Sequence, residues 1–283
     1  MTLDEVRAKI DAIDKELLRL LNERAECVNI VGTIKHREGL AIYAPQREEQ
    51  LLRKLAELNK AQNGRLPERS IRAIYREIMS AALALEQPLT IAYLGPTGSR
   101  THQVALSKFG HGVAYLSEAS ALGVFGRVAI KDADYGVLPI EHSTQGAVHH
   151  TLDQFVDSPL QICAQMLVTG EDDARSRYII LGHQSSPPSG DDSTMLFIEV
   201  PDAVGALLHV LEAFNKHGVN VRMIENRLAT SSDAAKVARF FLEVSGHAQD
   251  EPLGSVVSEL RASGGNVKVL GCYPSSAWVE TVG

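Results

Sequence analysis

The sequence predicts a multidomain chain with an all-α segment, a short α/β lobe and a final α+β segment. Apolar residues recur at helical spacing through residues 1–88. Beyond them, apolar strands alternate with helices, which is typical of α/β folds. From residue 192 the predicted order becomes strand, helix, strand, strand, helix, strand. We therefore place domains at 1–88, 89–184 and 192–283, with a Pro- and Gly-containing linker at 185–191.

The composition is that of an ordinary globular protein, with 45% hydrophobic and 22% charged residues among 283. No apolar run has the length of a membrane span, and the N-terminus predicts a charged amphipathic helix rather than a signal peptide. The three cysteines are widely spaced and form no metal motif, which favours a reducing, cytoplasmic location. The net charge of −7 gives no sign of the basic surface that is typical of nucleic-acid-binding proteins. We expect no metal and no cofactor.

A first long helix is predicted from Leu3 to about Arg37, opened by a capping box of Thr2 and Glu5. Its apolar residues at helical spacing are Leu3, Val6, Ile10, Ile13, Leu17, Leu20, Leu21, Cys27, Val28, Val31 and Ile34. At ~1.5 Å per residue this helix is roughly 50 Å long, which is too long for one small core to cover. Two shorter helices start at Pro45 and Pro67. Three helices of such unequal length bury their apolar faces best as an intertwined dimer.

Three cations on the long helix are candidates for an anion site. Arg24 and Lys35 are eleven residues apart, so at ~100° per residue their facing differs by only about 20°. They lie roughly 16 Å apart along the axis and could clasp a small anion. Arg7 is about 100° off that face and roughly 25 Å from Arg24, so it would serve a pocket in a second copy of the chain. Spacing alone leaves open the alternative that all three are solvated charges.

Residues 1–87 resemble the all-helical chorismate mutases. The matching positions are Arg7 in EVRAKIDAID, Arg24 in LLNERAE, Lys35 in VGTIKH, Arg47-Glu48 in APQREEQLL and Glu86 in REIMSAALALEQ. The resemblance implies a homodimer, or a higher homo-oligomer, that rearranges chorismate to prephenate. It also implies that each active site takes one arginine from the partner's long helix, which agrees with the angular position of Arg7.

The same resemblance implies a role for each matched residue. The catalytic positions are Arg24, Lys35, Glu48 and Glu86, and the substrate-binding positions are Arg7 and Arg47. The arginines would bind the two substrate carboxylates, because a guanidinium is planar, permanently charged and bidentate. Lys35 would donate to the ether oxygen on which negative charge develops, and Glu86 would approach the same oxygen. Glu48 would accept a hydrogen bond from the ring hydroxyl.

The stretch from Leu89 to 184 predicts a parallel α/β lobe and resembles the prephenate dehydratases. The match lies in Gly95-Pro96 with Gly98, in Tyr135-Gly136-Val137-Leu138-Pro139-Ile140-Glu141, in Thr151-Leu152-Asp153, and in Ser176-Arg177-Tyr178. That family has two lobes with its active site in the cleft between them, the second lobe being inserted within the first. Only Gly170 to Arg175 stands where about 80–100 residues would be needed for the insertion. The lobe is therefore expected to be truncated and without dehydratase activity.

The dehydratase motifs also depart from the family pattern. The family's Thr-Arg-Phe is Ser176-Arg177-Tyr178 here, and His142 replaces the Asn that follows Ile-Glu. We therefore interpret Glu141, Ser176 and Arg177 as a degenerate motif. The adjacent His149 and His150 point apart on a helix and predict no metal site.

The last segment resembles the ACT regulatory domains that end prephenate dehydratases. Gly205-Ala206-Leu207 matches the ligand-loop motif, and Glu225-Asn226-Arg227-Leu228 matches a second motif in part. The resemblance implies a phenylalanine or tyrosine effector at these residues. The alternative is a purely structural sheet that forms dimers.

Three functions follow. The leading hypothesis is a chorismate mutase of aromatic amino-acid biosynthesis, with a degenerate dehydratase lobe and a possible amino-acid-sensing ACT domain. The first alternative is an active bifunctional chorismate mutase/prephenate dehydratase. The second is a non-catalytic amino-acid-binding regulatory protein, against which the intact Arg24, Lys35, Arg47 and Glu48 argue.

Overall fold

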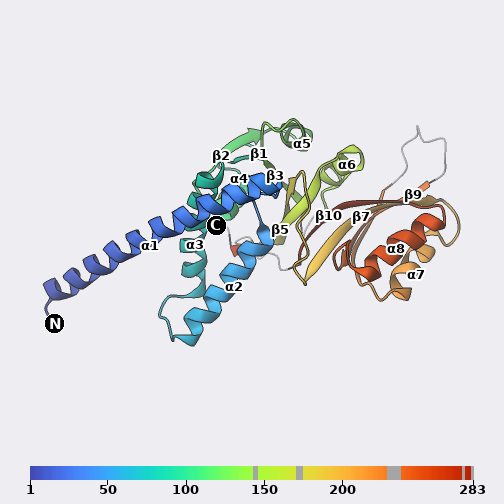
Figure 1. Ribbon diagram of the computed structural model, residues 1–283. Helices are drawn as coiled ribbons and strands as arrows, with labels where there is room; N and C mark the ends of the chain where they lie inside the picture. The colour runs from blue at the N-terminus through green and yellow to red at the C-terminus, as the bar shows by residue number, and fades with distance from the viewer. Residues whose placement is uncertain (143–145, 170–174, 228–236, 276–277, 282–283) are drawn as a thin grey trace. The chain divides into compact units, whose positions relative to one another are not determined.

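The computed structural model describes residues 1–142, 146–169, 175–227, 237–275 and 278–281. The chain divides into two compact units, and Figure 1 labels their helices and strands. The first comprises residues 1–44, 52–89 and 108–114, and the second comprises 45–51, 90–107 and 115–283. None of the described helices combines the length and the apolar character that a membrane crossing requires.

The first unit is built on three helices, α1 (Leu3–Glu38), α2 (Pro45–Ala61) and α3 (Glu68–Glu86). The predicted capping box opens α1: the Glu5 amide donates to Thr2 Oγ1 over 3.2 Å, and the Thr2 amide donates to Glu5 Oε2 over 2.8 Å. Gly39 ends α1 in the left-handed region at φ 67°, where a residue without a Cβ is unstrained. The first turn of α2, through Leu51, groups with the second unit.

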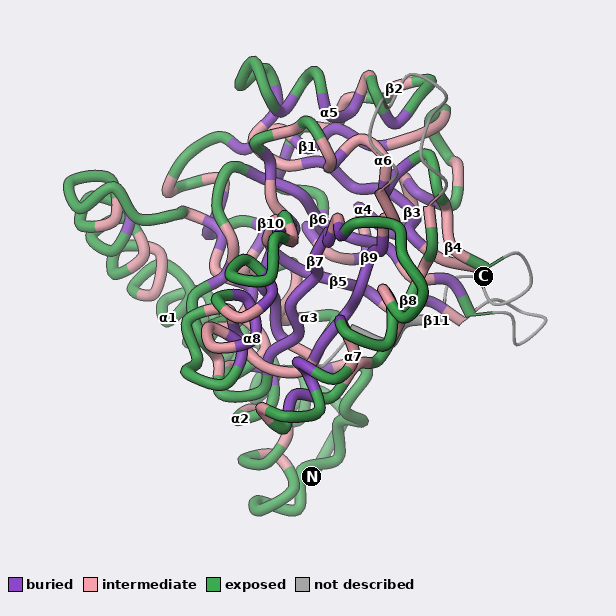
Figure 2. The backbone as a smooth tube through the Cα atoms, turned by 90° about the vertical axis from the view of Figure 1, so that its right-hand side faces the viewer, coloured by how far each residue is buried: buried purple, intermediate pink, exposed green. Residues whose placement is uncertain are grey.

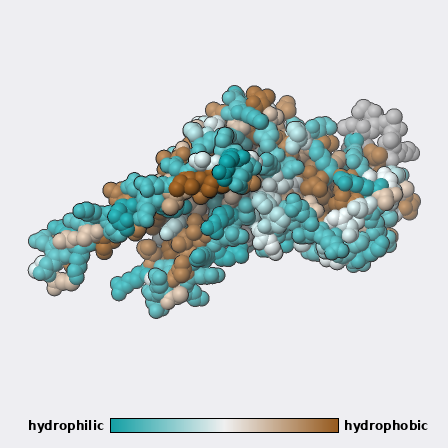
Figure 3. Space-filling model, in the orientation of Figure 1, coloured by the Kyte–Doolittle hydropathy of each residue, from teal (hydrophilic) through white to brown (hydrophobic). Residues whose placement is uncertain are grey.

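The apolar stripe of α1 is largely exposed in the single chain. Leu3, Ile10, Ile13 and Leu17 each expose 51% or more of their surface, and Gly32 is the one residue of α1 that is buried. Figure 2 shows most of α1 as exposed, and Figure 3 shows apolar side chains along its surface. Exposed apolar stripes of this length are typical of interaction surfaces.

The second unit contains a mixed sheet, sheet A, in the order β11-β5-β6-β3-β1-β2, with β4 paired to β3. Its strands are β1 (Thr90–Leu94), β2 (Ala114–Glu118), β3 (Tyr135–His142), β4 (Gly146–Ala147), β5 (Gln161–Thr169), β6 (Arg175–Gly182) and β11 (Trp278–Thr281). The accompanying helices are α4 (Arg100–Phe109), α5 (Ala121–Ala129) and α6 (His149–Asp157). β1 pairs with β3 in parallel, but β6 runs antiparallel to both β3 and β5. The prediction of a parallel lobe is therefore wrong for β6, because β5 and β6 join over too few residues for a crossover.

A second, four-stranded antiparallel sheet, sheet B, has the order β10-β7-β9-β8. Its strands are β7 (Asp192–Pro201), β8 (Val221–Arg227), β9 (Val237–Ser245) and β10 (Asn266–Pro274), and its helices are α7 (Ala206–Lys216) and α8 (Glu251–Ala262). One face packs on the two helices through a core that includes Leu196, Phe214 and Leu260. The other face packs on sheet A, since Phe197 and Phe241 share one core with Ile162 and Ile179.

The two sheets approach until their backbones touch. A Cβ added at Gly271 of β10 would lie 2.2 Å from the carbonyl oxygen of Ile162 on β5, so only glycine fits there. The predicted linker 185–191 is also packed: Ser186 is buried, and its hydroxyl donates to the Cys163 carbonyl over 2.7 Å. The strand expected to end the fold, β10, is followed by β11, which pairs with β5 of sheet A. The sequence-based division at 185–191 stays a prediction.

Candidate active site

Arg24 and Lys35 stand on one uninterrupted helix, because α1 runs from Leu3 to Glu38. The predicted difference of about 20° in their facing therefore applies to the folded chain. Both side chains are half-buried, unlike most of α1. The helix thus presents two cations along one face, roughly 16 Å apart along its axis.

Lys35 meets the far end of α3. Its ammonium donates to Glu86 Oε2 over 3.0 Å and to the carbonyl of Ile42 over 2.8 Å. The Lys35 side chain is 19% exposed and that of Glu86 only 8%, so this ion pair is largely withdrawn from water. Two residues 51 positions apart in the sequence are therefore brought together, at the position where the helices α1 and α3 cross.

Gly32, one turn before Lys35, allows this crossing. A Cβ at Gly32 would lie 3.1 Å from Cγ of Glu86 and 3.3 Å from its Cα. Any side chain at Gly32 would therefore push α3, and with it Glu86, away from α1. The sequence analysis missed Gly32, although a lone glycine inside a helical pattern is a signal of close packing.

The other mutase-like residues are Arg7 on α1 and Arg47 and Glu48 on α2. Arg7 is exposed, with 66% of its side chain accessible, and its nearest acid is Asp4 at 3.8 Å. Arg47 and Glu48 lie in the first turn of α2, where Arg47 is exposed and Glu48 is half-buried. Since Arg7 precedes Arg24 by roughly 25 Å along one helix, it cannot reach the same ligand within one chain.

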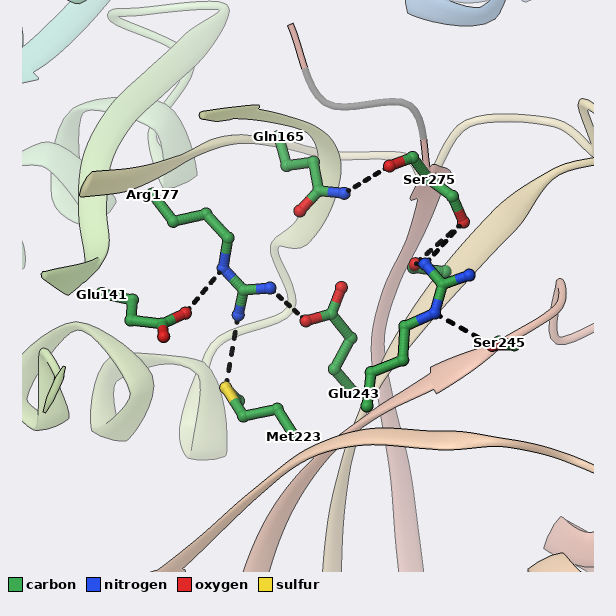
Figure 4. Close-up of polar contacts among 9 residues, drawn as sticks. Glu141, Gln165, Arg177, Met223, Glu243, Ser245 and Ser275 are labelled. Carbon is green, nitrogen blue, oxygen red and sulfur yellow. Dashed lines mark hydrogen bonds and ion pairs between the residues drawn. The ribbon is translucent and has the colours of Figure 1, made fainter. Parts of the chain in front are cut away.

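Arg177 on β6 lies between two carboxylates (Figure 4). Its Nη1 pairs with Glu243 of β9, and its Nε lies 3.1 Å from Glu141 of β3. Its Nη2 also donates to Sδ of Met223 over 3.2 Å. Burial by itself would lower the pKa of Arg177, but the two carboxylates raise it above the usual value. Burial, with Glu243 nearby, likewise raises the pKa of Tyr273 well above its usual range.

Ser176 and His142 face each other across the β3–β6 pairing. His142 Nδ1 and Ser176 Oγ are 3.0 Å apart, and Ser176 is buried. The three residues of the degenerate motif, Glu141, Ser176 and Arg177, are thus brought to one end of β3 and β6. Glu243, which the sequence analysis did not connect with them, completes the cluster from sheet B.

The predicted effector residues lie on two segments of sheet B. Gly205 caps α7 with a φ of 87°, and no atom would lie within 4 Å of a Cβ added to it. Ala206 and Leu207 begin that helix. Glu225 on β8 contacts His149 of α6 over 3.3 Å, and Asn226 is exposed. Leu228 lies outside the described residues. Among those described, no cluster of His, Cys, Asp and Glu has the geometry of a metal site.

Comparisons with known proteins decide the family. The profile described as chorismate mutase type II matches residues 6–87, and the profile described as prephenate dehydratase matches residues 91–170. A protein of Aquifex aeolicus named bifunctional chorismate mutase/prephenate dehydratase is 31% identical over 361 aligned positions, covering 98% of this chain and 99% of that protein. The chain belongs to the bifunctional chorismate mutase/prephenate dehydratase family.

Other relatives extend the comparison. A Pseudomonas aeruginosa protein of the same name is 29% identical, with 97% of this chain and 98% of that protein covered. The X-ray structure of prephenate dehydratase from Streptococcus mutans is matched at 28% identity and a TM-score of 0.57, over 65% of this chain and 97% of that chain. A prephenate dehydratase from Arthrobacter aurescens, 19% identical with a TM-score of 0.58, shares the fold.

Within this bifunctional family the chain is short. The alignment with the Aquifex aeolicus protein has 361 positions and the chain has 283 residues, so at least 78 positions, the difference between the two, have no counterpart here. In the structure, β5 ends at Thr169 and β6 begins at Arg175, which leaves no room for a further lobe between them.

Proposed function

We propose that residues 1–88 form a chorismate mutase that converts chorismate to prephenate in aromatic amino-acid biosynthesis. The observation that carries this proposal is the largely buried Lys35–Glu86 pair, on helices that match the chorismate mutase type II profile. The rearrangement is a single pericyclic step and needs no nucleophile. The protein has to hold a flexible dianion in its reactive shape and to stabilise the charge that grows on the ether oxygen.

Lys35 is suited to donate to that oxygen. An ammonium group has three hydrogens, and the bonds to Glu86 and to the Ile42 carbonyl use two of them. The third can turn toward the substrate, while Glu86 fixes the position of the nitrogen. Arg24 on the same helix face would then bind one substrate carboxylate, with Arg47 as a further substrate cation and Glu48 as the acceptor for the ring hydroxyl.

A second copy of the chain would complete the site. The exposed apolar stripe of α1, from Leu3 to Ile34, supports a homodimer held together along this helix. If the two α1 helices run antiparallel, Arg7 of the partner subunit can lie opposite the interval between Arg24 and Lys35. In a parallel pair in register it would be roughly 30 Å away from that interval.

Lys35→Ala tests the mutase assignment. Removing a preorganised donor to a developing oxyanion is expected to lower kcat for chorismate consumption by about 10²–10³-fold. Lys15→Ala, an exposed lysine of the same helix, is the matched control and should leave kcat unchanged. Equal activity of the two variants would remove Lys35 from the mechanism.

We further propose that the dehydratase-like lobe has lost its own catalysis. An anionic substrate that approached Arg177 would have to displace Glu243, whose side chain is only 3% exposed. Sheet B also packs against sheet A, and the relatives' additional positions are absent from this chain. A water-excluding cleft between two lobes would then be missing, together with the catalysis that depends on it.

An active bifunctional enzyme is the second candidate, and two observations favour it. The relatives that align over nearly the whole chain carry both activities in their names, and Ser176 keeps a hydroxyl 3.0 Å from His142. Incubating prephenate with the full chain and measuring phenylpyruvate separates the candidates. Turnover that disappears in Ser176→Ala would establish the bifunctional enzyme, and the absence of turnover in the parent would support a mutase alone.

The C-terminal part, from residue 192, is proposed to be an ACT domain that binds phenylalanine or tyrosine at Gly205, Ala206 and Leu207. Gly205 is exposed and no atom would lie within 4 Å of a Cβ added to it, so an amino acid's carboxylate has room to approach the start of α7. Isothermal titration of the full chain with each amino acid tests this. The absence of heat from both would favour a structural sheet.

A further inference from the structure

Arg222 occupies a β-bulge at the edge of sheet B. Val221 pairs with Val244 and Met223 pairs with Glu243, so Arg222 is the extra residue on β8 opposite two adjacent residues of β9. A bulge turns the side chain of its extra residue away from the regular alternation, and bulges are enriched beside functional sites. Here the bulge directs Arg222 over the neighbouring strands.

The Arg222 guanidinium donates hydrogen bonds to three serine hydroxyls, of which Figure 4 labels Ser245 and Ser275. Its Nε donates to Ser245 Oγ over 3.0 Å, and its Nη1 donates to Ser193 Oγ over 2.9 Å and to Ser275 Oγ over 3.0 Å. Ser193 and Ser245 are register partners on β7 and β9, and Ser193 is fully buried. Gln165 of β5 donates to the Ser275 carbonyl over 3.2 Å, which fixes the third serine.

This cluster has more donors than acceptors. A guanidinium has five N–H groups, and the bonds to the serines use three of them, which leaves the two of Nη2. Each serine oxygen that accepts from Arg222 keeps its own hydrogen, and one of these is used between Ser193 and Ser275, 3.0 Å apart. Two N–H and two O–H donors therefore remain without an acceptor among the described residues.

The charge of Arg222 is also not neutralised. Within the part of the chain that the structure describes, no carboxylate forms an ion pair with Arg222, whereas Arg177 on the same side of sheet B contacts two. The chain as a whole has a net charge of −7. A fixed cation surrounded by hydroxyl donors has the chemistry that binds an oxyanion.

We propose that Arg222, Ser193, Ser245 and Ser275 form a binding site for a small oxyanion, with the chemistry of a carboxylate or a phosphate. Nη2 and the free hydroxyl hydrogens would donate to two oxygens of the ligand. The site is distinct from the proposed effector segment at Gly205. Ser193 lies at the start of β7 and Gly205 follows the end of that strand, so the two residues are roughly 30 Å apart along the strand direction. The inference goes beyond the proposed mutase function and does not rest on it.

Anion titrations of the full chain test the site. Sodium phosphate and sodium malonate are titrated in turn by isothermal calorimetry at constant ionic strength, with sodium chloride as the control for general screening. Saturable binding of at least one anion is expected. The anion that binds more tightly shows whether the site prefers a phosphate or a carboxylate. Arg222→Gln should weaken that binding at least about tenfold, because it removes a charge-assisted donor.

Two further variants keep the test decisive. Lys216→Gln removes one positive charge from an exposed, acid-paired position on α7 and should bind as the parent does. Ser245→Ala, which leaves the buried Ser193 untouched, should weaken binding even if Arg222→Gln fails to fold. The proposal is overturned if the parent binds neither anion saturably, or if both Arg222→Gln and Ser245→Ala bind as tightly as the parent. In that case Arg222 would have only a structural role, holding the ends of the strands together through its hydrogen bonds to the serines.

Discussion

Substitution of Gly32 tests whether the α1–α3 crossing sets the mutase geometry. The added Cβ of Gly32→Ala would lie 3.1, 3.2 and 3.3 Å from Cγ, Cβ and Cα of Glu86. Carbon atoms pack best at about 3.5–4.0 Å, so α3 must yield by a few tenths of an ångström. Gly32→Val adds two further carbons at the same point and requires a shift on the order of 1 Å.

The two variants should separate stability from activity. Replacing glycine by alanine inside a helix stabilises by about 0.5–1 kcal/mol, which offsets the tight contact and leaves Gly32→Ala close to the parent. Overpacking in Gly32→Val should cost about 1–3 kcal/mol. A misplacement of 1 Å at a catalytic group can cost about 10²-fold, so kcat/KM for chorismate should fall by that order in Gly32→Val and by only a few fold in Gly32→Ala.

The assay is chorismate consumption, measured with thermal unfolding on the same samples. Asn29→Val is the matched control, since it places the same β-branched residue on α1 at an exposed position outside the apolar stripe. Parent-like kcat/KM in a folded Gly32→Val would refute the role of the crossing. An equal loss in Asn29→Val would show that the effect comes from the helix as a whole.

The remaining predictions concern the dimer and the joined sheets. If Arg7 of the partner subunit lies opposite the interval between Arg24 and Lys35, the twofold axis crosses α1 near residue 18. Leu17→Cys in a Cys27→Ser background should then be linked into dimers by a short bismaleimide, whereas Lys15→Cys, about 200° around the helix, should stay monomeric on a denaturing gel. Gly271→Ala should prevent folding of the second unit or lower its Tm strongly, because the Cβ would lie 2.2 Å from a backbone oxygen on β5. A Gly271→Ala variant with parent-like near-ultraviolet circular dichroism and Tm would contradict the contact between the sheets.

Local patterns in the sequence were sufficient for the helical segment. The capping box and the apolar spacing predicted a helix from Leu3 to about Arg37, and α1 runs from Leu3 to Glu38. The capping box and the apolar spacing each involve residues close together in the sequence, so they predict the helix without reference to the rest of the fold. The facing of Arg24 and Lys35 followed from the same helical geometry.

Contacts between distant segments could not be predicted in this way. The Lys35–Glu86 pair joins positions 51 residues apart, and the pairing of Arg177 with Glu243 joins sheet A to sheet B. Both depend on how elements pack, which periodicity does not encode. The prediction of a parallel lobe overlooked that the short connection to β6 forces an antiparallel pair. β11 was not predicted, because a short strand at a sheet edge has no distinctive pattern.

Mixing two inactive variants tests the central claim, a mutase site shared between two copies, most directly. Arg7→Ala and Arg24→Ala should each lose most chorismate mutase activity when purified alone. Unfolded together in equal amounts and refolded, they should form mixed dimers in half of the cases, each with one complete site that combines Arg24 of one chain with Arg7 of the other. The mixture should therefore recover about a quarter of the parent's kcat per chain. A mixture that stays as inactive as its components, although mixed dimers have formed, would contradict the account.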